Sequence, residues 1–316
     1  MSSRALVLGS GGLTGVAWEA GVLKGLADVG YPLSGWDLVV GSSAGAFVGA
    51  RLLGEGSPGP LFEAQLAIDV AAEEAALRSV TGGLLVALLR ASRRRRLARL
   101  ERLGVIPLIL RAAFTNAARD GLGELGVVSA AARSRKPGVP PEIALRAMGR
   151  LARGVRTPQQ AWINYWIRAL GPVEDWPTDR LVVTAIDIAD GSRLAMDRTT
   201  GVPLARALAA TSAIGGLLPA ITVDGHQYID GGTGSQTNAD LATGIEEVLV
   251  LAPSDRGSLA GETEALAASG SEVRVIRPSP SAVAALGQDL GRLDPARCAA
   301  SARLGSDDGR HSPHAG

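Results

Sequence analysis

The feature that most constrains the fold is the stretch from Asp37 to Ala50, which reads DLVVGSSAGAFVGA. Its first residues form a short apolar run that predicts a buried strand, and its Ala-rich end predicts the start of a helix. The G-x-S-x-G pentapeptide between them is typical of a sharp turn that joins a strand to a helix. The sequence therefore predicts a strand, a tight turn and a helix in immediate succession.

The spacing of the glycines in this turn has a steric cause. A chain that passes from strand to helix within a few residues holds the turn residue at strained backbone angles, and its neighbours two positions away must lack side chains. Gly41 and Gly45 meet this requirement around Ser43. The Ser43 hydroxyl would then be exposed beside the first N–H groups of the helix, which makes it a candidate nucleophile. The alternative is an ordinary Gly-rich turn, which arises by chance in a chain rich in Gly, Ala and Ser.

A second Gly-rich segment lies near the N-terminus. Residues 4–9 predict a strand, residues 10–15 a loop, and residues 16–29 a helix. Such a loop exposes backbone N–H groups at a helix N-terminus, where they form a site for an anion. Because parallel strands end at one edge of a sheet, we expect this loop and Ser43 to open on the same edge.

Two anions are candidates for this loop. A dinucleotide pyrophosphate requires G-x-G-x-x-G, but the sequence gives Gly9, Gly11 and then Thr14 in place of the third glycine. The other candidate is the transient oxyanion of acyl transfer, which requires two N–H donors fixed near a nucleophile. The oxyanion is favoured because it uses the loop and Ser43 together.

Composition excludes several classes of function. A chain of 316 residues with 46% apolar residues buries a large core, and its net charge of +1 gives no argument for nucleic acid. Cys298 is the only cysteine, and two of the three histidines, His311 and His314, lie near the end of the chain. We therefore expect neither a disulfide nor a metal site. The chain begins with a predicted strand and shows no leader pattern, so we expect a cytoplasmic protein.

The middle of the chain, residues 57–175, is rich in Ala, Leu, Arg and Glu with breaks at Gly and Pro. This pattern predicts helices, which we interpret as a helical insertion or cap over the site. The arginine run at residues 93–96 predicts a solvated helix face or a surface for anionic lipid or another acidic partner. Trp162, Tyr165 and Trp166 recur at helical spacing and are expected to pack in the core, with a substrate pocket as the alternative.

The remainder of the chain returns to strands around an acidic motif. Asp224-Gly225 predicts a two-residue hairpin turn, and the second hairpin strand runs into Asp230-Gly231-Gly232. Asp230 is a candidate site residue at the sheet edge, with a turn cap as the alternative. From Gly305 onward the composition predicts disorder. The other elements predicted are strands at 181–188, 247–251 and 272–276 and helices at 202–213 and 257–268.

Three separated motifs now stand in order, and together they resemble the patatin-like phospholipase family. The family carries a Gly-rich loop, then G-x-S-x-G, then D-G-A/G, and the resemblance covers about the first 55 residues and residues 181–251. It implies a three-layer α/β/α fold with a mostly parallel central sheet and a helical insertion. The domain would span residues 1–304, followed by a disordered tail at 305–316. The residues that match the motifs are Gly11, Gly12, Gly15, Gly41, Ser43, Gly45, Asp230, Gly231 and Gly232.

The resemblance also implies a mechanism. Ser43 and Asp230 would form a catalytic Ser-Asp dyad, with an oxyanion hole made by the N–H groups of Gly11, Gly12 and Ala44. The activity implied is hydrolysis of lipid acyl esters through an acyl-enzyme, without a cofactor. The alternative Ser-Asp-His triad would need a histidine on an ordered element after the acid, and the histidines there lie in the predicted tail.

Two positions depart from the family pattern. Ser10 replaces the first glycine of the loop and Thr14 replaces the usual basic residue, which predicts weaker binding of an oxyanion or an anionic head group. Two other functions stay open on the sequence: an acyltransferase on the same site, and a catalytically weak lipid-binding or regulatory protein. A lipid or acyl ester is the expected partner, peripheral contact with a membrane is left open, and the oligomeric state is not indicated.

Overall fold

The computed structural model describes residues 2–81, 85–86, 89–90, 152–255 and 257–312. The arginine run at 93–96 and much of the predicted helical insertion therefore lie outside the described residues. Where the interval 57–175 is described, its regular elements are helices, in agreement with the sequence.

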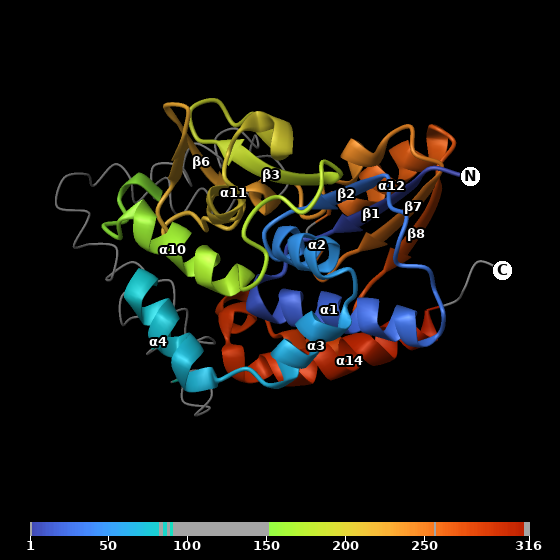
Figure 1. Cartoon of the computed structure of the whole chain (residues 1–316), viewed down its shortest axis with the longest axis horizontal. Coiled ribbons are helices and arrows are strands. Elements are labelled where there is room, and N and C mark those ends of the chain that lie inside the picture. Colours follow the sequence, from blue (N-terminus) through green and yellow to red (C-terminus); the bar gives the residue numbers. More distant parts are fainter. Residues whose placement is uncertain (1, 82–84, 87–88, 91–151, 256, 313–316) are drawn as a thin grey trace.

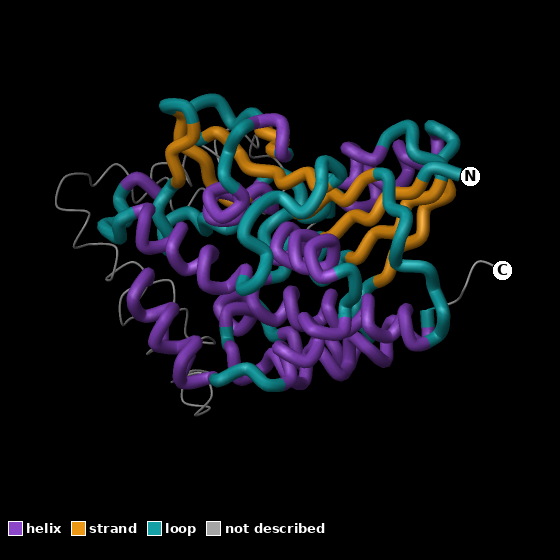
Figure 2. Tube along the Cα trace, in the orientation of Figure 1, coloured by secondary structure: helices purple, strands orange, loops and turns teal. Residues whose placement is uncertain are grey.

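The centre of the molecule is an eight-stranded sheet in the order β5-β6-β3-β2-β1-β7-β8, with β4 paired to β3 (Figure 2). The pairs β1–β2, β2–β3, β1–β7 and β7–β8 are parallel, whereas β4 and β6 run antiparallel to β3. The sheet is therefore mostly parallel, as predicted. The strands are β1 Arg4–Leu8, β2 Leu38–Gly41, β3 Leu181–Asp187, β4 Arg193–Met196, β5 Ile221–Val223, β6 His226–Asp230, β7 Glu247–Leu251 and β8 Glu272–Ile276.

Helices cover both faces of this sheet (Figure 1). The α-helices are α1 Gly12–Asp28, α2 Ala44–Glu55, α3 Gly59–Leu66, α4 Val70–Thr81, α10 Gln159–Leu170, α11 Leu204–Thr211, α12 Leu259–Ala268, α13 Pro280–Leu286 and α14 Cys298–His311. Short 3₁₀ helices are η2 Arg198–Thr200, η3 Gly231–Thr233, η4 Ala239–Ala242, η5 Asp289–Leu293 and η6 Pro295–Arg297.

The core divides into two layers because successive strand residues point to opposite faces. Leu6 and Leu8 of β1 pack with the helices on the side of α1 and α2. Ala5 and Val7 of the same strand pack with α12 and η4 on the other side. The three-layer α/β/α architecture is thereby confirmed.

The hairpin formed by β5 and β6 is confirmed. Asp224 and Gly225 have φ values of 48° and 82°, the left-handed pair that a tight two-residue turn requires. The hairpin extends the sheet beyond β3. It ends at Asp230, which pairs with Ala185 in the C-terminal half of β3.

The C-terminal prediction is wrong in part. Residues 305–311 are not a disordered tail but the end of α14, which packs along α1. Glycines permit this close approach, because a Cβ at Gly305 would overlap the Trp18 carbonyl oxygen. The composition rich in Gly, Asp and Ser was misleading because these residues weaken an isolated helix but fit a tight interface.

Other element boundaries shift. The predicted helix at 16–29 begins at Gly12, within the Gly-rich loop, and strand β4 was not predicted. Among the described residues, no helix combines the length and the hydropathy needed to cross a membrane.

Candidate active site

Ser43 lies at the turn between β2 and α2 with φ 53° and ψ −112°, a strained conformation for a residue with a side chain. Its neighbours leave room for glycine alone. A Cβ at Gly41 would overlap the Cα of Ala46, and a Cβ at Gly45 would overlap the carbonyl oxygen of Leu8. The tight turn thus depends on both glycines.

This turn is tied to the end of β1. Ser42 N–H donates to the Leu8 carbonyl at 3.1 Å, and Gly45 N–H donates to the Gly9 carbonyl at 3.1 Å. The Ser10 hydroxyl lies 3.4 Å from the Ser42 carbonyl oxygen. The Gly-rich loop and the Ser43 turn therefore meet at one edge of the sheet.

The expected oxyanion donors lie at helix starts. Gly12 and Ala44 are the first residues of α1 and α2, where a backbone N–H has no partner within the helix. Gly12 has φ 66°, and a Cβ there would lie 2.7 Å from the Arg292 carbonyl oxygen. Gly11 caps α1, and a Cβ on it would lie 2.6 Å from the Cα of Gly15. Gly12 and Ala44 line the same pocket as Ser43.

Asp230 lies on the far side of β3 from Ser43, at the same level of the sheet. Gly41 pairs with Val183, and Asp230 pairs with Ala185, two residues further along β3. Ser43 is likewise two residues beyond Gly41. The register thus places the backbone of Ser43 and that of Asp230 at the same level on either side of β3.

One short segment contacts both residues. Ser43 N–H donates to Thr211 Oγ1 at 2.9 Å, and Asp230 N–H donates to the Ala213 carbonyl at 3.1 Å. The two residues, separated by most of the chain, are therefore anchored two positions apart on one segment, Ser43 by the Thr211 hydroxyl and Asp230 by the Ala213 carbonyl. Thr211 was not singled out from the sequence as a site residue.

The turn after Asp230 is packed against the other two motifs. Asp230 Oδ1 accepts the Gly232 N–H at 2.7 Å, so the carboxylate does cap a turn. A Cβ at Gly231 would overlap the Thr184 carbonyl oxygen, and one at Gly232 would overlap Ser10 Oγ. Only glycines allow the acidic turn to approach β3 and the Gly-rich loop this closely.

Ser43 opens into a largely apolar pocket with about 500 Å³ of empty space, part of it open to solvent. A lining that is largely apolar is typical of a small-molecule site. The sequence did not single out the aliphatic lining residues, because they come from separate elements. The lining consists of Gly12, Leu13, Val16, Ser43, Ala44, Leu77, Thr81, Leu85, Trp162, Tyr165, Trp166, Ser212, Ile214, Leu217, Leu218 and Leu293.

The aromatic cluster of α10 both packs in the core and lines this pocket. Trp162 and Tyr165 stack at 4.7 Å between ring centroids, and Trp166 meets Phe47 of α2 at 5.4 Å. The Tyr165 hydroxyl donates to Glu73 of α4 at 2.6 Å. The two alternatives considered for these side chains are therefore compatible.

Thr14 does not point into the pocket. Its side chain is fully buried, and Oγ1 donates to the Leu286 carbonyl at 2.9 Å, which joins α1 to α13. A basic side chain at this position would have to be buried between helices. In this chain, the threonine at position 14, where the family has a basic residue, serves the packing of α1 against α13.

The described histidines lie away from Ser43. His226 starts β6, at the opposite end of the strand from Asp230, and its Nδ1 lies 2.8 Å from Asp187 Oδ2. His311 is on an ordered helix, contrary to prediction, but Arg310 beside it pairs with Asp28 at the C-terminal end of α1. The length of α1, about 25 Å, separates that end from the Gly-rich loop. In the described ranges, no three His, Cys, Asp or Glu side chains are grouped to hold a metal ion.

The family model of the patatin-like phospholipases matches residues 6–243, which include all three motifs. The chain belongs to this family. Its fold and the order of its motifs agree with the resemblance seen in the sequence.

Two solved structures are similar to the chain at low identity. The type III effector protein ExoU has 14% identity and a TM-score of 0.36, over 98% of this chain and 54% of that one. VipD from Legionella pneumophila has 16% identity and a TM-score of 0.37, over 98% of this chain and 66% of that one. The chain thus spans about half to two thirds of their lengths. Curated proteins give no match.

Proposed function

We propose that this family member is a serine acyl hydrolase that cleaves lipid acyl esters. The observation that carries the proposal is the position of Ser43: a strained serine between a strand and a helix, at the wall of a largely apolar pocket. A strained turn exposes a hydroxyl for attack, and an apolar pocket suits an acyl chain. Membership of the patatin-like phospholipase family supports the same substrate class.

The proposed first step is acylation. Asp230 accepts the proton of Ser43 Oγ as that oxygen attacks the ester carbonyl carbon. The N–H groups of Gly11, Gly12 and Ala44 stabilise the oxyanion, and one such donor is typically worth about 3 kcal/mol. Collapse of the tetrahedral intermediate breaks the ester C–O bond, and Asp230 returns the proton to the leaving alkoxide.

Deacylation then uses water. Asp230 takes a proton from a water molecule that attacks the Ser43 acyl ester, and Ser43 Oγ leaves with that proton. The products are a fatty acid and an alcohol. The acyl chain is held in the pocket, where each buried methylene contributes about 0.8 kcal/mol to binding.

A covalent probe tests the nucleophile. A fluorophosphonate should label the wild-type protein and should not label Ser43→Ala, because the probe reacts with an activated serine hydroxyl. Ser212 is the other serine that lines the pocket. If label were lost in Ser212→Ala and kept in Ser43→Ala, the assignment of Ser43 would be wrong.

Measurements of turnover test the role of Asp230 as the base. Asp230→Asn keeps an oxygen that can accept the Gly232 N–H, so we expect it to fold. Without a base its hydrolysis of nitrophenyl esters and phospholipids should fall by about 10²- to 10⁴-fold. Turnover equal to that of the wild type would rule out the dyad.

A further inference from the structure

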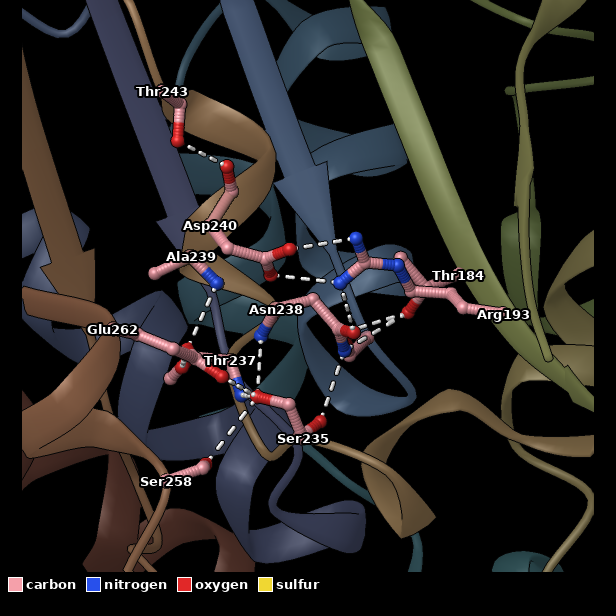
Figure 3. Close-up of polar contacts among 11 residues, drawn as sticks. Thr184, Arg193, Ser235, Thr237, Asn238, Ala239, Asp240, Thr243, Ser258 and Glu262 are labelled. Atoms are coloured by element: carbon pink, nitrogen blue, oxygen red, sulfur yellow. Dashed lines mark hydrogen bonds and ion pairs between the residues drawn. The ribbon is translucent and has the colours of Figure 1, made fainter. Parts of the chain in front are cut away.

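A network of buried polar side chains lies behind the Ser43 turn. Ser42 and Thr184 are fully buried and Asn238 is 1% exposed. Ser42 Oγ lies 2.8 Å from Thr184 Oγ1 and accepts a hydrogen bond from Asn238 Nδ2 at 2.8 Å. Figure 3 shows the Asn238 side chain reaching from its own loop toward Thr184 and Arg193, which lie together on one side of it.

The orientation of the Asn238 amide is fixed by Arg193. The guanidinium of Arg193 carries only donors, and its Nη1 donates to Asn238 Oδ1 at 3.0 Å. The same guanidinium donates to both carboxylate oxygens of Asp240 at 2.7 Å (Figure 3). With the oxygen of the amide held by Arg193, the NH₂ group must face Ser42.

The loop that carries Asn238 is itself held in place. Asn238 has φ 53°, and its N–H donates to Ser235 Oγ at 2.9 Å while Nδ2 also donates to the Ser235 carbonyl at 2.9 Å. Glu262 of α12 accepts from Thr237 Oγ1 at 2.6 Å and from Ala239 N–H at 3.0 Å. Asn238 is therefore a rigid support for Ser42.

We propose that Asn238 is a positioning residue that holds Ser42, and through Ser42 the strained backbone of Ser43. A strained residue keeps its conformation only where several contacts over-determine it. Ser42 precedes Ser43 directly, and its hydroxyl is fixed to Asn238 and Thr184. The catalytic consequence rests on the proposed function, because it concerns the attack of Ser43 on an ester.

The test compares Asn238→Ala with a matched control, Thr237→Val. Asn238→Ala removes the hydrogen bonds of the amide to Ser42, Thr184, Ser235 and Arg193. Thr237→Val removes a side-chain hydrogen bond from the same loop, but the Thr237 hydroxyl donates to Glu262 of α12 and not to the Ser43 turn. We expect Asn238→Ala to lower the rate of fluorophosphonate labelling and kcat by about 10- to 100-fold, with KM changed by less than about threefold. Thr237→Val should label within about twofold of the wild type, although it also loses a buried hydrogen bond of this loop. Equal labelling rates in the two variants would overturn the proposal.

A second variant covers the case in which Asn238→Ala does not fold. Ser42→Ala removes the acceptor at the other end of the same hydrogen bond and changes a single atom. Ser42→Ala should lower the rate of fluorophosphonate labelling by about 10- to 100-fold, as Asn238→Ala does. Labelling of Ser42→Ala at the wild-type rate would overturn the proposal.

A conformational readout separates this proposal from the proposed function. If the wild-type protein takes no label, the proposed function fails, and crystal structures of the two variants decide the inference. Movement of Ser43 out of its positive-φ conformation in either variant supports the positioning role. Retention of that conformation in every variant that folds contradicts it.

Discussion

Glu19 shows how strongly tertiary burial acts on a single residue. Its side chain is fully buried in the middle of α1, and neither carboxylate oxygen has a hydrogen-bond partner among the described residues. Burial raises the pKa of Glu19 well above its ordinary value, and the nearby backbone of Gly9 opposes this only in part. The carboxyl is therefore neutral over a pH range in which an exposed glutamate is charged.

This raised pKa predicts a loss of stability as pH increases. Above the unfolded pKa of about 4.3, the unfolded chain releases the Glu19 proton while the folded chain retains it, so the free energy of unfolding falls until the folded pKa is reached. Glu19→Gln removes this contribution. We expect the variant and the wild type to differ least in melting temperature at pH 4, and the variant to melt higher at pH 8. A difference in melting temperature that is constant with pH would contradict this prediction.

At the residue scale, sequence patterns identified which residues are candidates for the site, but not which groups surround each side chain. Ser43 was singled out because a tight turn around it requires residues without side chains two positions away on either side. The structure shows this requirement at Gly41 and Gly45, where an added Cβ would overlap backbone atoms. Thr14 was interpreted as a lost cation in the site, yet its side chain joins two helices. A side chain's direction depends on packing partners such as Leu286, which lie far away in the sequence.

At the scale of elements, the tightest packing is between α1 and α14. A Cβ at Gly21 would overlap the Ala302 carbonyl oxygen and lie 2.8 Å from Ser306 N. Backbone atoms cannot move aside as a flexible side chain can. The close approach of the two helices therefore depends on glycine.

Gly21→Ala should destabilise the protein by about 3 kcal/mol, because the helices must separate to admit one methyl group. Gly261 is the matched control, since it is also helical, in α12, and an added Cβ meets nothing within 4 Å. Gly261→Ala should stabilise by about 0.5–1 kcal/mol through helix propensity. Denaturant unfolding of both variants measures the two effects, and a neutral Gly21→Ala would contradict the packing argument.

Elements with a strong local pattern were predicted, and those that depend on partners were not. The hairpin around Asp224-Gly225 follows from its turn residues, and β1 and β2 follow from short apolar runs. The end of α14 lacks such a pattern because its glycines and serines face α1. Helix formation there is driven by burial against a distant segment, not by local propensity.

At the scale of the whole molecule, the pocket is assembled from elements far apart in the chain. Leu77 comes from α4, Trp166 from α10 and Leu217 from the loop after α11, while Ser43 directly precedes α2. Helices of the predicted insertion thus supply one wall of the pocket. We propose that they belong to a single domain with the sheet, and that this domain extends to residue 311 because α14 packs on α1.

A larger side chain at this wall should shorten the preferred acyl chain. Leu77 is buried at the pocket, so Leu77→Trp takes space from the acyl chain. Exclusion of two methylenes costs about 1.6 kcal/mol, or about 15-fold in the ratio of kcat/KM for a dodecanoyl ester to that for an acetyl ester. Arg78→Trp introduces the same side chain at the exposed neighbouring position and should leave the ratio unchanged. An unchanged ratio in Leu77→Trp would show that the acyl chain does not bind in this pocket.

The sequence by itself determined the sheet strands other than β4, the Ser43 turn and the ordered set of motifs, because each depends on sterics and hydrophobicity within a few neighbouring residues. Tertiary structure alone decided which distant residues meet at the carboxyl edge of β3: Thr211 and Ala213 beneath Ser43 and Asp230, and Asn238 behind Ser42. These contacts join segments separated by up to 196 positions in the chain. No local pattern encodes them, because they form only when the whole sheet and its helices have packed.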